Sequence, residues 1–293
     1  MPAANRALGR NVHIYAASDP TEVFGGLVLT NGVTKANFYS MMEVFLFFES
    51  SYVLRHEDAT DAMKDVPKDE QALQPGNYYI VTDGSITVNN EAWLIRTISV
   101  ASRTRVVSFR DAVRDRDRRC VITGEKALDA EYGLWEGFEA AHVFPLAHER
   151  HWREHNYGRW ITIPSATESA GSINSVQNGM LLRADIHALF DSYTVSINPD
   201  DNHKIVCFRR DGKGIAGSHL DQQRFLDDPR RPVDQVLRWH FRQTVLANMR
   251  GAGEPVFETD FPPGSDMMGE IMEGPKAAER LEFEFFSRLA GVT

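Results

Sequence analysis

Three short stretches of this sequence decide how its fold is interpreted. They are Cys120-Val-Ile-Thr-Gly124, Glu139-Ala-Ala-His-Val-Phe-Pro145 and Asn178-Gly-Met-Leu-Leu-Arg-Ala-Asp-Ile-His-Ala-Leu-Phe-Asp191. Their polar residues stand at spacings that core packing alone does not require. The three stretches therefore predict a polar site that is supported by a packed core.

The second stretch predicts a short buried strand that ends close to His142. This histidine follows two alanines and precedes Val143, Phe144 and Pro145. Because proline lacks the amide hydrogen that strand pairing needs, we expect the strand to break there.

The third stretch predicts a helix that begins just after Asn178. Its apolar residues would share one helical face: Leu182, Ile186, Leu189 and Phe190. His187 and Asp191 are four residues apart, so on a helix their side chains point the same way. A strand histidine, an asparagine before a helix and a His/Asp pair one turn apart favour a hydrolytic metal site.

The order of these residues resembles the HNH endonucleases, in which two strands and a helix enclose one metal ion (the ββα-metal motif). His142 through Pro145 is similar to the His-hydrophobic-x-Pro of that family, and Asn178 follows in the family order. His187 comes nine positions after the asparagine, and Asp191 falls where several members place a further metal ligand. The resemblance covers roughly residues 105–210.

Two departures from the family pattern bear on metal binding. Many HNH proteins carry two Cys-x-x-Cys pairs for a structural zinc, but here Cys120 is followed by Thr123, and Arg183 and Ile186 occupy the second pair. We therefore expect no such zinc. The residue before the base histidine is often a metal ligand, but Ala141 cannot coordinate a metal, so the matched positions supply at most two protein ligands.

The resemblance implies a role for each matched residue. His142 would be the general base that takes a proton from water, since a neutral imidazole accepts protons near neutral pH. Asn178 would hold the base loop or the imidazole in orientation through a hydrogen bond. His187 and Asp191 would hold one divalent cation, for which Mg²⁺ is the first expectation and Mn²⁺ or Zn²⁺ the alternatives.

A basic segment directly before the site predicts contact with nucleic acid. Residues 103–119 contain seven arginines and three aspartates, although the whole chain has a net charge of −9. Such a local segment can bind phosphates in an acidic protein, but arginines on a solvated helix face are the alternative. Glu139 matches an acidic position that steadies a phosphate-binding arginine in some relatives, and Arg118 or Arg119 is its candidate partner.

The composition is that of an ordinary globular protein. The chain has 293 residues, of which 42% are hydrophobic, so two domains with proper cores are expected. Its two cysteines exclude a disulfide framework. Residues 1–10 have no apolar stretch of signal-peptide length, and the longest apolar run, residues 44–48, is too short to span a bilayer. We expect an intracellular protein, in the cytoplasm or nucleus, without a membrane segment.

The pattern of elements predicts an α+β protein in three parts. Residues 1–100 would form an N-terminal α+β domain, residues 101–250 the HNH nuclease domain, and residues 251–293 a linker and a C-terminal amphipathic helix. The first part is expected to contain strands at residues 12–15, 26–29, 78–81 and 86–88, a helix over residues 37–52 and a polar surface loop over residues 58–74. The histidines of this part stand alone in the sequence, without companions at the spacing of a catalytic site, so no catalytic site is expected there.

Further elements are predicted in the second and third parts. A helix over residues 108–117 would be capped by Ser108 and Asp111. Residues 148–177 look like an insertion, in which His151 and His155 supplement the metal site or are simply solvated. The remaining expectations are a hairpin of residues 193–197 and 204–208, a helix over 232–249, a linker over 252–274 and a helix over 277–289.

Together these features predict a metal-dependent HNH endonuclease that hydrolyses phosphodiester bonds in nucleic acid, with DNA as the expected substrate. The alternative is a catalytically weak or inactive HNH-fold module that binds nucleic acid. Ala141 and the missing zinc cysteines favour that alternative.

Overall fold

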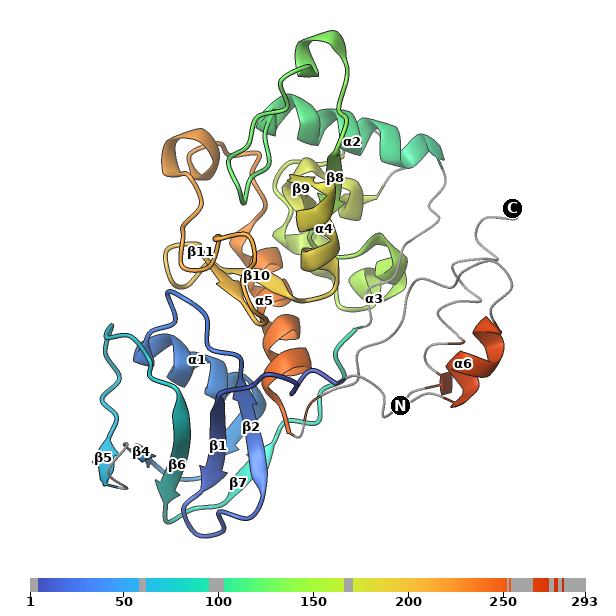
Figure 1. Cartoon of the computed structure of the whole chain (residues 1–293). Helices are drawn as coiled ribbons and strands as arrows, with labels where there is room; N and C mark the ends of the chain where they lie inside the picture. Colours follow the sequence, from blue (N-terminus) through green and yellow to red (C-terminus); the bar gives the residue numbers. More distant parts are fainter. Residues whose placement is uncertain are drawn as a thin grey trace.

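The computed structural model describes residues 5–57, 62–94, 103–165, 171–251, 253, 266–273, 277–278 and 281. Helices and strands are mixed along this part of the chain, which agrees with the predicted α+β class. Figure 1 places a sheet at one end of the molecule, a group of strands and helices at the other, and α5 between them. No helix of the described residues combines the length and the apolar character needed to cross a bilayer.

The sheet has five strands in the order β2-β1-β6-β4-β5. Their bounds are Val12–Ala16 for β1, Val23–Leu27 for β2, Tyr52–Glu57 for β4, Met63–Asp65 for β5 and Gly76–Thr82 for β6. Strand β1 lies parallel to β6 and antiparallel to β2. Helix α1 (Lys35–Phe45) packs its buried side chains Phe38, Met41 and Phe45 into the same core as Ile14 and Ile80.

The helix predicted over residues 37–52 is too long at its C-terminal end. Helix α1 is fixed at its start by a capping box, in which Thr34 and Asn37 exchange side-chain to backbone hydrogen bonds. It ends at Phe45, and Leu46–Phe48 forms β3, which pairs with β7 (Ile86–Val88). Aromatic residues pack well on a pleated surface, so the run after Phe45 prefers a strand. The predicted polar loop contains β5, and its residues 58–61 lie outside the described residues.

The second region begins with α2 (Arg103–Asp117) and is built around two paired strands. Strand β8 (Phe138–His142) lies antiparallel to β9 (Gly179–Arg183), with His142 opposite Gly179. Helix α4 (Ala184–Asp191) follows β9 directly. A short helix, η1 (Ala130–Tyr132), precedes β8. Five more fill the connection between the two strands: η2 (Leu146–His148), α3 (Glu149–Glu154), η3 (Tyr157–Trp160), η5 (Ser172–Asn174) and η6 (Val176–Asn178).

Two predicted helix starts in this region are wrong. The helix expected directly after Asn178 begins only at Ala184, because residues 179–183 form β9. A continuous apolar run fits a buried strand as well as a helix, so periodicity could not separate them. Helix α2 begins at Arg103, so Ser108 lies inside it rather than at its N-cap.

The remaining described elements follow the second region. Strands β10 (Val195–Asn198) and β11 (Lys204–Cys207) form the predicted hairpin, and α5 (Asp234–Met249) is the predicted long helix. A π-helical segment, η7 (Gln222–Leu226), lies between them. The predicted linker over residues 252–274 contains a helix, α6 (Met267–Glu273). Most of the helix predicted over residues 277–289 lies outside the described residues.

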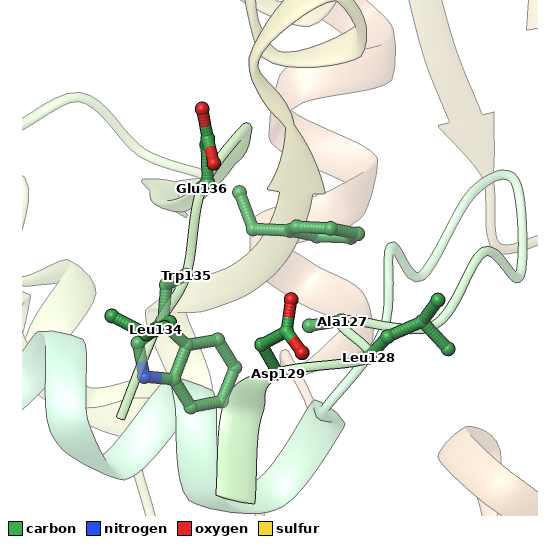
Figure 2. Close-up of a pocket in the computed structure, with 7 residues that line it drawn as sticks. Ala127, Leu128, Asp129, Leu134, Trp135 and Glu136 are labelled. Atoms are coloured by element: carbon green, nitrogen blue, oxygen red, sulfur yellow. The ribbon is translucent and has the colours of Figure 1, made fainter. Parts of the chain in front are cut away.

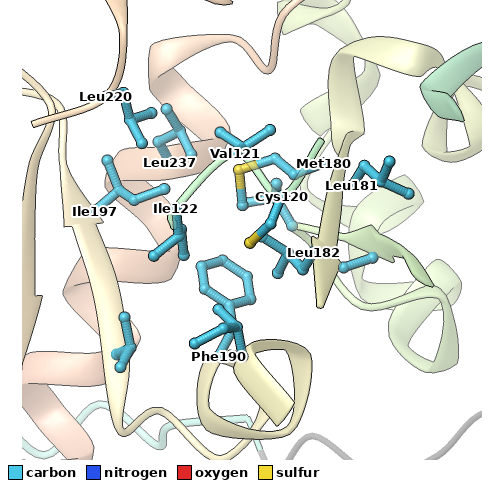
Figure 3. Close-up of a cluster of buried hydrophobic side chains, with 14 of the residues drawn as sticks. Cys120, Val121, Ile122, Met180, Leu181, Leu182, Phe190, Ile197, Leu220 and Leu237 are labelled. Carbon is cyan, nitrogen blue, oxygen red and sulfur yellow. The ribbon is translucent and has the colours of Figure 1, made fainter. Parts of the chain in front are cut away.

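Two hydrophobic clusters form the core, and α5 contributes to both. In the second region, side chains of β9, α4 and the Cys120–Ile122 segment meet Leu237 of α5 (Figure 3). The other end of α5 adds Val245 and Leu246 to the cluster of the five-stranded sheet. The hairpin also supplies Val206 to the sheet cluster. The two regions therefore share a helix, and their division into independent domains near residue 100 stays a prediction.

The regions also touch through their backbones. A Cβ atom added to Gly32 would lie 2.2 Å from the Cα atom of Gly217, and both glycines have a positive φ, +81° and +82°. Nearby, Thr30 Oγ1 donates a hydrogen bond of 2.8 Å to the carbonyl oxygen of Cys207. Only glycine fits on both sides of this contact, because a side chain would meet backbone and the backbone conformation is left-handed.

Candidate functional site

His142 lies at the end of β8, where the strand pairing stops. Its Nε2 atom is 3.1 Å from Oδ1 of Asn174. Its ring stacks on Phe109 of α2, with the ring centroids 3.8 Å apart and the planes 11° apart. The imidazole is thus held by a hydrogen bond at one edge and by an aromatic ring on one face.

Asn178 is completely buried and clamps the backbone that follows His142. The amide of Phe144 donates to Oδ1 at 2.8 Å, and Nδ2 donates to the carbonyl oxygens of Phe144 and Ile173 at 3.0 and 2.9 Å. Its own carbonyl accepts from the amide of Val143 at 2.8 Å. Asn178 therefore contacts the loop after His142, whereas Asn174 contacts the imidazole itself.

A buried ion pair supports the same segment from α2. The side chains of Arg116 and Asp117 are 1% and 0% exposed, with Nε and Oδ1 2.5 Å apart. The Arg116 guanidinium also donates to the carbonyl oxygens of Val176 and Gly179 at 2.9 and 2.7 Å. These two carbonyls flank Asn178, so α2 fixes the backbone on both sides of the asparagine. Asp117 accepts from the amide of Leu181 at 2.8 Å, which connects α2 to the middle of β9.

The predicted metal ligands form a group with Glu139. On α4, His187 Nε2 lies 3.2 Å from Oδ2 of Asp191, one helical turn away. Its Nδ1 lies 2.6 Å from Oε2 of Glu139 on β8. One imidazole is therefore placed between two carboxylates from two elements.

These carboxylates control the charge of His187. Burial by itself would lower the pKa of the imidazole, but the hydrogen bonds and negative charges of Asp191 and Glu139 outweigh it and raise this pKa to about 9. The hydrogen bond from His187 in turn lowers the pKa of the Glu139 carboxyl. At neutral pH this arrangement is a positively charged ring between two negative groups.

Glu139, His187 and Asp191 carry donor atoms that can bind a divalent cation. Their side chains, however, are not arranged as a coordination shell. Carboxylate oxygens and imidazole nitrogens are common ligands of such cations. Both nitrogens of His187, however, contact carboxylates. Among the described residues, no three His, Cys, Asp or Glu side chains are placed to hold a metal ion. His187 and Asp191 remain the two matched positions with donor atoms.

The two candidate phosphate-binding arginines lie where α2 ends. Arg118 is exposed and adopts a positive φ of 51°, and Arg119 is half-buried with a backbone bridge to Lys126. Within the described part of the chain, neither forms a hydrogen bond or ion pair with Glu139, whose contact is His187. Their role at a phosphate stays a prediction.

The histidines of the connection between β8 and β9 form an aromatic group. The rings of His151 and His155 stack with centroids 3.8 Å apart, and both approach Tyr157. His151 also stacks on Phe144 at 6.1 Å. Their described contacts are with these aromatic rings and, for Nδ1 of His155, with the carbonyl oxygen of His151, rather than with the predicted metal pair.

Sequence reasoning missed three residues that hold the site: Phe109, Asn174 and Arg116. Phe109 was one apolar residue of an arginine-rich helix, and Arg116 was one of seven similar arginines. Asn174 belongs to the polar run Ser-Ile-Asn-Ser-Val-Gln-Asn178, most of which lies in the predicted insertion of residues 148–177. A signal was present there, because this run leads directly into Asn178.

A pocket of about 150 Å³ lies beside the site rather than in it. It is formed by the loop before β8 and is lined by Leu134, Trp135, Asp129 and their neighbours (Figure 2). Three apolar side chains of this loop are exposed: Leu128, Tyr132 and Leu134. None of the predicted site residues lines the pocket.

Two family models match the chain, one in each of its two regions. Residues 9–87 match a domain of unknown function (DUF8573). No curated protein and no solved structure matched the chain. Residues 120–198, which contain His142, Asn178, His187 and Asp191, match the family described as HNH endonuclease. The chain therefore carries a domain of the HNH endonuclease family, as the resemblance of its motifs predicted.

Proposed function

We propose that this protein is a metal-dependent endonuclease that hydrolyses phosphodiester bonds in nucleic acid, with DNA as the expected substrate. The observation that carries the proposal is the clamp of Asn178 on the loop after His142. A buried asparagine that binds the backbone next to a half-buried histidine fixes that histidine in space. Fixed geometry is what a general base needs, because the proton transfer depends on distance and direction.

His142 is the proposed general base, which takes a proton from the attacking water. Asn178 holds its loop, and Phe109 and Asn174 contact the ring. His187 and Asp191 would hold a divalent cation, with Mg²⁺ first and Mn²⁺ or Zn²⁺ as alternatives. When bound, that ion would supply positive charge for the phosphate oxygens and the leaving oxygen.

Arg118 and Arg119 are the proposed contacts to backbone phosphates of the nucleic acid. The exposed Arg118 side chain can reach a ligand without losing a buried ion pair. Phosphate contacts carry no base identity, so they support binding of nucleic acid without sequence selection. Glu139, whose carboxylate contacts the ring of His187, is proposed to support the two metal ligands His187 and Asp191.

The alternative is an HNH-fold module that binds nucleic acid and cleaves weakly or not at all. Two observations favour it: Ala141 stands where many relatives have a ligand, and the described residues contain no ready group of three metal ligands. Binding without turnover separates this alternative from the endonuclease.

The test uses the full chain with supercoiled plasmid and Mg²⁺, Mn²⁺ or Zn²⁺, with and without a chelator. We expect nicking that the chelator abolishes. His142→Ala should reduce the rate by about 10²- to 10⁴-fold, which is the usual contribution of a general base. The matched control is His219→Ala, since His219 is an exposed histidine outside the site.

The same assay is run with a structured RNA and a single-stranded DNA to compare substrate classes. Folding and DNA binding of His142→Ala should match the wild type, because His142 acts on water rather than on the scaffold. A His142→Ala protein that nicks within a few-fold of wild type would remove His142 from the role of base. A wild-type protein that retards DNA in a gel but does not nick it would establish the alternative.

A further inference from the structure

We propose that Asn174 is a positioning residue that fixes the tautomer of His142, with the proton on Nε2 and the lone pair on Nδ1. In this arrangement Nδ1 is the atom that accepts the proton from water. The inference rests on the proposed role of His142 as the base. Position 174 is not one of the motif positions matched above, and it lies four residues before the matched asparagine.

The contact between the two side chains is short and sheltered. Oδ1 of Asn174 lies 3.1 Å from Nε2 of His142, and Asn174 is 2% exposed. A carboxamide oxygen only accepts hydrogen bonds, so the facing nitrogen must carry hydrogen. In a neutral imidazole the other nitrogen then has the lone pair. A third group that orients the base is the general pattern of activated catalytic histidines.

One asparagine holds both partners of this contact. Nδ2 of Asn178 donates to the carbonyl of Phe144, two residues after His142, and to the carbonyl of Ile173, immediately before Asn174. The backbone segments that carry the histidine and its acceptor are therefore fixed to the same side chain. This explains how Asn178 can orient the base without touching its ring.

Phe109 fixes the plane of the imidazole, and Gly179 makes room for Phe109. The Phe109 ring lies almost parallel to that of His142, at 11°. A Cβ atom added to Gly179 would lie 2.5 Å from two carbons of the Phe109 ring. The φ of Gly179 is −137°, which any residue can adopt, so space rather than backbone conformation requires glycine. Gly179 stands opposite His142 in the strand pair, so a larger residue would displace the ring that supports the base.

The first test reads the tautomer and needs no activity. The full chain is labelled with ¹⁵N-histidine, and the ring signals of His142 are assigned by their loss in His142→Ala. We expect the Nε2–H tautomer in the wild type and a larger share of the Nδ1–H tautomer in Asn174→Ala. A wild-type His142 with its proton on Nδ1 would overturn the inference. So would an Asn174→Ala protein in which the tautomer is unchanged.

The second test reads the pKa of the base through the pH dependence of cleavage. In Asn174→Asp, a buried carboxylate of nearly the same shape faces Nε2–H and favours the charged imidazole. The acidic limb of the kcat/KM profile should therefore move to higher pH. Asn174→Ala should lower kcat by about 10- to 100-fold with little change in KM, since positioning supplies part of the contribution of the base.

Asn198→Ala is the matched control for these variants. Asn198 is also a buried asparagine, at 5% exposure, and its side chain accepts a hydrogen bond from the amide of Asp200 rather than contacting His142. It should lower stability without moving the pH profile. An unmoved acidic limb in Asn174→Asp would contradict the inference. A wild type that does not cleave would contradict the proposed function alone, and the tautomer would still decide the role of Asn174.

Discussion

The five-stranded sheet and the segment before β9 bury opposite kinds of residue. Inward-facing residues of β1 and β6 are apolar, such as Val12, Ile14 and Ile80. Of residues 174–178, by contrast, four are polar and buried: Asn174, Ser175, Gln177 and Asn178. Burying apolar area stabilises a fold in proportion to that area, whereas buried polar groups add little net stability but are costly to leave without partners. The sheet therefore supplies stability, and the polar segment supplies a fixed geometry.

The largest effect is expected from separating the two regions. Removing residues 1–100 takes away most of the apolar side chains that share a cluster with Phe241, Val245 and Leu246 on α5. Each such side chain contributes about 1.5–3 kcal/mol when fully buried. The fragment 101–293 should therefore nick DNA with metal but unfold at a much lower urea concentration than the full chain.

Urea unfolding and plasmid nicking of the fragment check this prediction, and limited proteolysis of the full chain locates the boundary. A folded fragment that binds metal without nicking would mean that the N-terminal region completes the active site. Affinity or substrate preference should change on deletion if that region governs targeting.

The next largest effects are expected from replacing one buried residue in each region. Asn178→Ala leaves the amide and carbonyl of Phe144 without their partners, at about 1–3 kcal/mol for each buried group. Leu54→Ala in β4 opens a cavity in the sheet, at about 2–5 kcal/mol. Chemical denaturation should give similar losses of stability. Nicking at a temperature where both variants are folded should fall only for Asn178→Ala, and equal nicking would break the proposed contrast.

A smaller effect is expected at the charged group of α4. His187→Ala and Asp191→Ala should each weaken divalent-ion binding by more than the roughly 10- to 100-fold that is typical for losing a group that only supports a ligand. The double variant should be little worse, because ligands of one ion act as a unit. Glu139→Gln should weaken it less, since Glu139 contacts His187 rather than occupying a matched ligand position. Isothermal calorimetry measures this directly. Unchanged affinity in both single variants would exclude the proposed pair.

The smallest effect is expected at the surface arginines. Arg118→Ala and Arg119→Ala should each weaken DNA binding by a similar factor for every sequence. The slope of log K against log salt should become shallower by about one unit for each phosphate that the variant no longer binds. Arg55→Ala on the sheet is the control, since Arg55 is an exposed arginine paired with Asp65. If Arg55→Ala changes the slope as much as Arg118→Ala, binding is not confined to the second region.

The parts of the fold that sequence predicted are those fixed by local signals. Pro145 indicated the end of β8, and the Pro-Asp-Asp-Asn turn indicated the β10–β11 hairpin. Strand β9 could not be recognised, because Met180, Leu181 and Leu182 are all buried and a run of this kind has no period. Only its pairing with β8 makes it a strand.

The candidate site was predictable where residues follow the spacing of the family and not where tertiary contact places them. His187 and Asp191 are one turn apart on α4, as their spacing required. Phe109 is distant from His142 in the sequence and reaches it only because α2 packs on the β8–β9 pair. The contact of His187 with Glu139 likewise joins a helix to a strand, which no local pattern encodes.

The contact of Gly32 with Gly217 limits how the two regions can change in evolution. One glycine precedes α1 in the region that matches DUF8573, and the other follows β11, outside the part that matches the HNH family. A side chain at either position meets backbone of the other, so a change on one side cannot be compensated by a smaller residue on the other. A different N-terminal module could be recombined onto the second region only if its loop passed Gly217 equally closely or left it uncovered. Natural relatives with exchanged N-terminal regions should therefore accept asparagine at position 217, since asparagine tolerates its left-handed backbone, whereas those that keep this pairing should retain both glycines.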